Sequence, residues 1–77
     1  MAELLAFLAR ELVSDPEAVR VETEERDGAL VLRLHVGEGD VGKVIGRRGR
    51  IVRALRTVMR ATAARDGRRV LVEVCDP

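Results

Sequence analysis

Two helical patterns in this chain meet at the tetrapeptide Gly46-Arg47-Arg48-Gly49, and this junction limits the possible folds most strongly. Glycine adopts backbone angles that other residues resist, so two glycines three positions apart permit a tight turn and a close approach to another molecule. The two enclosed arginines supply fixed charge and a planar fork of donors that suits phosphate. The tetrapeptide therefore predicts a loop between two helices that can hold a phosphate backbone.

A short helix is expected before this loop, over 41–45, and a long one after it, over 50–64. Asp40 is a suitable N-cap residue for the short helix. The long helix has one apolar face, with arginines on the adjacent arc. Asp66-Gly67 should end it, with Gly67 at the C′ position. The expected core face comprises Ile51, Val52, Leu55, Val58, Met59 and Ala63.

Three apolar or alternating runs predict strands at 19–24, 30–36 and 70–74. Asp27-Gly28 between the first two predicts a hairpin, so these two strands should pair antiparallel. The third strand follows two helices, and such a crossover should make it a parallel neighbour of the second. In the second strand one face should point toward the core, while the opposite face carries Val31, Arg33 and His35.

The N-terminal segment 2–13 predicts one further helix, ended by Ser14-Asp15-Pro16 because the residue before proline avoids helical angles. Its only aromatic residue, Phe7, falls off the centre of the apolar stripe and could close one edge of the core or take part in a subunit contact. The order αββααβ then predicts a single two-layer α+β domain over 1–77. The stripe comprises Leu5, Leu8, Ala9 and Leu12, with Leu4 beside it.

The net charge of +1 conceals a strong asymmetry between the two halves of the chain. Residues 1–40 hold four arginines and ten acids, which gives −6, whereas 41–77 hold ten basic residues and three acids, which gives +7. Between positions 41 and 65 there are eight basic residues and no acid. Such a division indicates an anionic partner, for example nucleic acid or a membrane surface.

A second glycine pattern, Gly37-Glu38-Gly39-Asp40-Val41-Gly42, has the letters of the dinucleotide-binding fingerprint. That fingerprint needs a long helix behind it and an acid about 20 positions onward. Here the next helix reaches Gly46 within a few residues, and the next acid is Asp66. We therefore reject a nucleotide cofactor.

Enzymatic activity has little support in the sequence. His35 stands alone on a strand and Cys75 lies near the C-terminus, so no nucleophile–base pair and no metal site is apparent. We expect no cofactor. A single cysteine fits a reducing compartment, and no apolar run approaches the roughly 20 residues of a membrane span. The N-terminus lacks the pattern of a signal peptide, so the expected location is the cytoplasm.

The short helix, the Gly-x-x-Gly loop and the long helix, set within αββααβ order, resemble a KH domain of the type II arrangement over essentially the whole chain. The resemblance implies a three-stranded mixed sheet packed against helices on one face. It also implies that the loop clamps the backbone of about four nucleotides of single-stranded RNA.

Residue roles follow from the same resemblance, position by position. Gly46 and Gly49 would permit a close backbone approach, while Arg47 and Arg48 would sit where phosphates pass. The apolar groove that receives bases would involve Val44, Ile45 and Ile51. The positive surface along which the phosphates pass would be extended by Lys43, Arg50 and Arg53.

The resemblance implies an RNA chaperone or post-transcriptional regulator, acting as a homodimer or with a second KH-containing RNA-binding protein. Stacking on aromatic rings, which many RNA-binding folds use, is not expected because Phe7 is the only aromatic residue. The alternative is a protein-interaction module that docks through Leu4 and Phe7, in a ribosome- or cell-envelope-related complex. The residues do not distinguish RNA from single-stranded DNA.

Overall fold

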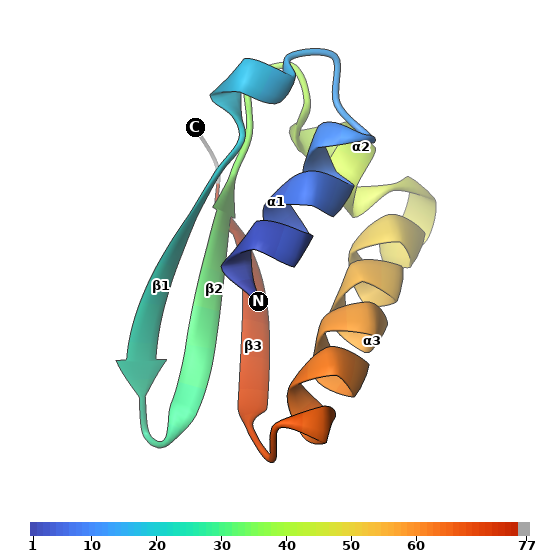
Figure 1. The fold of residues 1–77 in the computed structure, drawn as a ribbon. Coiled ribbons are helices and arrows are strands. Elements are labelled where there is room, and N and C mark those ends of the chain that lie inside the picture. Colours follow the sequence, from blue (N-terminus) through green and yellow to red (C-terminus); the bar gives the residue numbers. More distant parts are fainter. Residues whose placement is uncertain (76–77) are drawn as a thin grey trace.

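The computed structural model describes residues 1–75, so the last two positions of the expected 1–77 domain lie outside the described residues. Its helices are α1 (Ala2–Arg10), α2 (Val41–Ile45) and α3 (Arg50–Arg65), and its strands are β1 (Arg20–Arg26), β2 (Ala29–His35) and β3 (Arg69–Cys75). Two single-turn 3₁₀ helices, η1 (Pro16–Ala18) and η2 (Arg47–Gly49), lie in the connections. Figure 1 shows this αββααβ order, which confirms the predicted fold class.

The three strands form one mixed sheet in the order β1-β2-β3. Strand β1 pairs antiparallel with β2, and β2 pairs parallel with β3, as predicted. Asp27 and Gly28 have φ of 52° and 81°, the pair of positive angles that a type I′ hairpin turn requires. Because this turn is tight, pairing continues to Arg26 and Ala29, so β1 and β2 extend closer to the turn than the sequence indicated.

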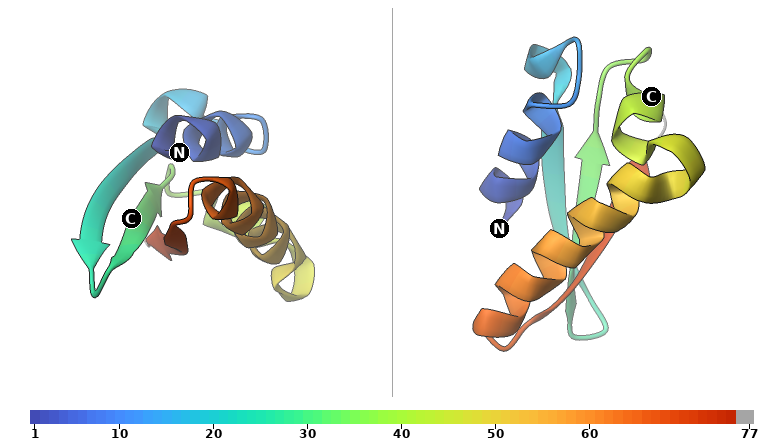
Figure 2. Two further views of the ribbon diagram at one scale, coloured as in Figure 1. Left: turned by 60° about the horizontal axis from the view of Figure 1, so that its bottom comes forward. Right: turned by 90° about the vertical axis from the view of Figure 1, so that its right-hand side faces the viewer.

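Helices α1 and α3 cover one face of the sheet and leave the other face open (Figures 1 and 2). Between the helices and the sheet lies the core, whose members come from the alternating faces of the strands and the apolar stripes of the helices. Its largest completely buried side chains on this side are Leu5, Leu32, Leu34, Val44 and Met59.

The open face of the sheet contains one unexpected buried residue. Val31 was predicted on the outward face with Arg33 and His35, yet its exposure is 0%. Arg26 of β1 pairs with Glu73 of β3, with Nη1 and Oε2 3.5 Å apart. The Arg26 side chain therefore reaches across β2, which lies between those strands, and Glu24, the β1 partner of Val31, pairs with Arg26 and Arg33 on the same face. The alternation of strand residues predicts the face of Val31 correctly. It does not predict that the long side chain of Arg26 extends across that face.

Helix α1 ends at Arg10 rather than at Val13. The N–H groups of Ser14 and Asp15 donate to the two carboxylate oxygens of Asp40, at 3.2 and 3.0 Å, and draw the chain out of the helical path. Asp40 is the N-cap residue of α2, as predicted, but its side chain makes no capping hydrogen bond because its carboxylate accepts from the α1–β1 connection. Asp40 instead ties that connection to the start of α2.

Helix α3 ends at Arg65, within one residue of its predicted end. Gly67 follows at the predicted C′ position with φ 68°, and Arg68 N–H donates to the Ala63 carbonyl at 2.9 Å. One predicted core residue differs: Val58 is 43% exposed. Val58 lines an apolar groove between α1 and α3 that is open to solvent. No helix among residues 1–75 has the length and apolar character to cross a membrane.

Candidate nucleic-acid interface

The glycine loop joins α2 to α3, and both of its glycines have positive φ. Gly46 has φ 78° and ψ 169°, and Gly49 has φ 73°. A Cβ atom on Gly46 would lie 2.3 Å from Cγ1 of Ile51, so the position excludes any side chain. The N–H of Gly49 donates to the Gly46 carbonyl at 3.1 Å and closes the turn. Both glycines are thus needed for the local path of the backbone.

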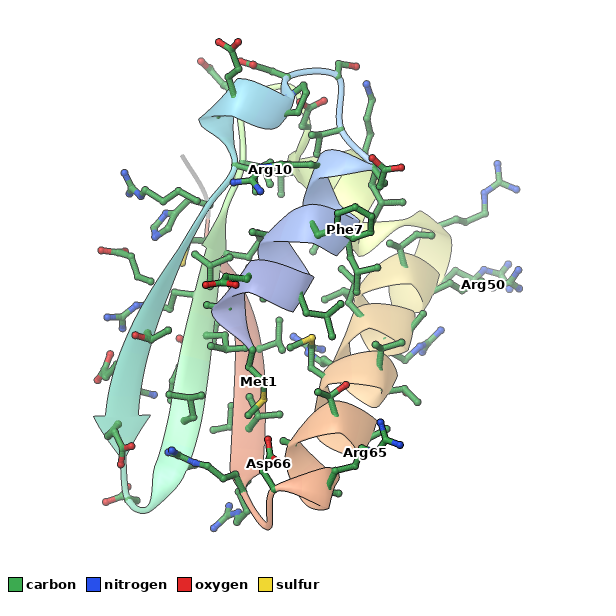
Figure 3. All side chains as sticks on the ribbon, viewed as in Figure 1. Met1, Phe7, Arg10, Arg50, Arg65 and Asp66 are labelled. Atoms are coloured by element: carbon green, nitrogen blue, oxygen red, sulfur yellow. The ribbon has the colours of Figure 1, made fainter. Side chains whose placement is uncertain are left out.

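The two arginines between the glycines are exposed to solvent. Arg48 has φ 58° and ψ 26°, a left-handed conformation that costs a residue with a side chain about 1 kcal/mol. Backbone strain of this kind is common at binding sites. Arg50 and Arg53, at the start of α3, are also exposed, and Figure 3 shows Arg50 projecting away from the body of the domain. The loop and the first turn of α3 therefore form one positive surface.

Lys43 was expected to extend this positive surface but is held elsewhere. Its ammonium group pairs with Asp40 Oδ1 at 3.3 Å and donates to the Ser14 hydroxyl. The pKa of Asp40 is lowered, first because Ser14 N–H donates to its carboxylate, with burial opposing and Asp15 and Lys43 contributing further. In this structure Lys43 stabilises the contact between α2 and the α1–β1 connection.

The three apolar residues that were expected to receive bases occupy different environments. Val44 is completely buried, so its side chain belongs to the core and cannot touch a base. Ile51 is half-buried and lines a groove between α1 and α3, away from the sheet edge. Only Ile45, half-buried at the end of α2 and next to the loop, remains partly open to a ligand.

A groove between α3 and the free edge of β3 was not assigned to the site from the sequence. It has a volume of about 290 Å³ and is lined by Arg56, Arg60 and residues 70–73. The sequence signal was the arginine arc of α3, which continues past Arg53. Helical periodicity does not predict that β3 is an edge strand and lies along this arc.

Neither the described histidine nor the described cysteine supports catalysis. His35 Nε2 lies 2.5 Å from Glu22 Oε1 on the open face of the sheet, and this hydrogen bond is the main reason that the pKa of Glu22 is lowered. Within residues 1–75, no group of three histidine, cysteine, aspartate or glutamate side chains is placed to hold a metal ion.

A Gly-x-x-Gly loop between two helices, beside the edge of a mixed sheet in αββααβ order, defines a type II KH domain. The family model described as the KH domain of KhpA/KhpB matches residues 2–74, and the chain belongs to that family. Among curated proteins, RNA-binding protein KhpA of Borreliella burgdorferi is 45% identical over 74 residues, which cover 96% of this chain and 90% of the relative. RNA-binding protein KhpA of Treponema pallidum is 46% identical, covering 96% and 92%. RNA-binding protein KhpA of Clostridium acetobutylicum is 42% identical, covering 96% and 99%.

Proposed function

We propose that this protein binds single-stranded RNA without catalysing a reaction. The observation that carries the proposal is the exposed pair Arg47 and Arg48, of which Arg48 has a left-handed backbone, held between two glycines with positive φ. The relatives are named RNA-binding proteins, which supports the same ligand class.

In the proposed mode of binding, the loop grips the phosphates and the α3–β3 groove receives bases. Arg47, Arg48, Arg50 and Arg53 provide a positive surface on one side of this path. The edge of β3 offers backbone groups on the other side, together with Leu71, which is 44% exposed. A site for about four nucleotides without aromatic stacking gives modest affinity, so sequence preference should be weak outside the groove.

A modest affinity suits a protein that contacts many transcripts briefly, as an RNA chaperone or post-transcriptional regulator does. We expect it to act in the cytoplasm, where Cys75, a free thiol, would stay reduced.

Fluorescence anisotropy with a labelled single-stranded RNA tests this proposal. Binding should weaken as salt rises, with log K falling by about 0.7 per log unit of salt for each phosphate neutralised. Duplex RNA of the same sequence serves as the comparison and should bind more weakly. Absence of binding at low salt would reject the proposal, and equal binding of single-stranded DNA would widen it to both nucleic acids.

We propose homodimerisation as a second property, because the groove between α1 and α3 is apolar and open. Leu8, Leu12, Ala54 and Val58 line this groove. Phe7 is 58% exposed and projects from the side of α1 nearer α3 (Figure 3). Helix α3 carries five arginines and no acid, whereas the charges of α1, Glu3 and Arg10, balance. A two-fold arrangement would place the apolar groove of one copy against the same groove of the other and keep the arginines of α3 at its rim.

Dimerisation would also raise RNA affinity, because two linked sites act at a high effective concentration. A second KH-containing RNA-binding protein with a similar apolar groove would fit the same surface. Light scattering across protein concentrations distinguishes monomer from dimer, and a pull-down with and without nuclease distinguishes a direct partner from one bridged by RNA.

A further inference from the structure

One guanidinium in the α3–β3 groove is fixed in orientation by the protein itself. Arg56 is half-buried, and its Nε–H donates to the carbonyl of Val72 at 3.2 Å. Arg60, the next arginine along the groove, is exposed. Fixing a guanidinium plane in advance removes part of the entropy cost of binding through it. Arg56 is therefore better preorganised than Arg60 to make an orientation-dependent contact with a ligand.

The bond to Val72 leaves most of the donors of Arg56 available. A guanidinium has five N–H donors, and this bond uses one, so the two terminal nitrogens, Nη1 and Nη2, remain for a ligand. The only acid among the six residues that line the groove is Glu73, which pairs with Arg26. Arg56 thus presents a fork of two donors in a groove wide enough for a base.

We infer that Arg56 determines which base the groove accepts, and that it favours a base with two adjacent hydrogen-bond acceptors. This inference rests on the proposed RNA-binding function. Guanine offers O6 and N7, and cytosine offers O2 and N3. Adenine N1 and N7 each lie beside the N6 amino donor, adenine N3 has no second acceptor beside it, and both uracil carbonyls lie beside N3–H, so one arm of the fork would stay unpaired. A bidentate contact of this kind gives a preference of about fivefold or more.

Hexauridylates in which one central base is replaced by guanine, cytosine or adenine provide the test. The wild-type protein should bind the guanine or the cytosine hexamer at least about fivefold more tightly than the adenine hexamer and unsubstituted hexauridylate. Arg56→Lys keeps the charge but removes the fork, so it should lose this preference while its salt dependence stays the same. Arg60→Lys is the matched control and should keep the preference.

Equal affinity of the wild-type protein for all four hexamers, or an unchanged preference in Arg56→Lys, would overturn the inference. If Arg56→Lys fails to fold, modified RNA tests the wild-type protein directly: 7-deazaguanine lacks N7 and 3-deazacytosine lacks N3. The analogue of the preferred base should lose its advantage, and an unchanged advantage would again overturn the inference. Binding of all hexamers without base preference would leave the proposed RNA-binding function intact. If no hexamer binds at low salt, both the proposed function and the inference about Arg56 are rejected.

Discussion

Ile51 occupies the space that a side chain on Gly46 would need, with its Cγ1 2.3 Å from the ideal Cβ position. The contact crosses the loop from its first residue to the start of α3. It couples the backbone of the loop to the apolar side of the helix, so the shape of the loop depends on the packing of α3.

Gly46→Ala should therefore lower the free energy of unfolding by at least about 2 kcal/mol, because strain at positive φ adds to the clash with Ile51. Chemical denaturation measures the effect. Gly42→Ala is the matched control, since a Cβ there has no atom within 4 Å and the residue lies within α2. The control should be neutral or stabilising by up to about 1 kcal/mol. Equal losses in both variants would contradict the proposed role of the contact.

Arg48→Gly should separate backbone strain from charge. Glycine accepts the left-handed conformation of residue 48 without cost, so stability should stay the same or rise by up to about 1 kcal/mol. RNA affinity should fall, and the salt slope should decrease by about 0.7 if Arg48 neutralises one phosphate. A loss of stability would show that the Arg48 side chain supports the fold instead.

Asp40 should make stability depend on pH in the acid range. Its pKa is lowered in the folded protein, so its contribution is complete above the unfolded value of about 4 and is lost as pH falls through the lower folded value. Asp40→Asn should reduce the melting temperature at pH 7, and the difference from wild type should shrink toward pH 2. Asp66→Asn removes one carboxylate at the exposed end of α3 and should leave the melting temperature at pH 7 unchanged. A difference at pH 7 that persists unchanged at pH 2 would contradict the assignment.

Val58→Asp should abolish the proposed dimer, because it places a charge in the apolar groove between α1 and α3. Leu71→Asp is matched in exposure, at 44% against 43%, but lies on β3 outside that groove. Light scattering should show a dimer for wild type and Leu71→Asp, and a monomer for Val58→Asp. A dimer that survives Val58→Asp would place the interface elsewhere.

Local rules were sufficient to predict the order of the elements and the sheet pairing. Asp27-Gly28 fixes the hairpin because both residues adopt positive φ readily, and Gly67 ends α3 for the same reason. The two glycines of the loop could likewise be found from their spacing and from the helical patterns on both sides.

The errors arose where long-range contacts decide a residue's environment. Val31 is buried on the face where Arg26 reaches across β2 to Glu73, and Asp40 binds N–H groups 25 and 26 positions away. Val58 is exposed because the groove between α1 and α3 is open. The position of Arg56 against the edge of β3 also depends on how the helix lies on the sheet, which periodicity does not report.

The most direct test of the central claim is the affinity of Arg47→Asp/Arg48→Asp for single-stranded RNA. Both side chains are exposed, so the double variant should keep its circular dichroism spectrum and melting temperature while RNA binding is abolished. Arg10→Asp/Arg20→Asp makes the same change in net charge at two other exposed positions and should bind nearly as well as wild type. A folded Arg47→Asp/Arg48→Asp protein that binds RNA with wild-type affinity would contradict the account.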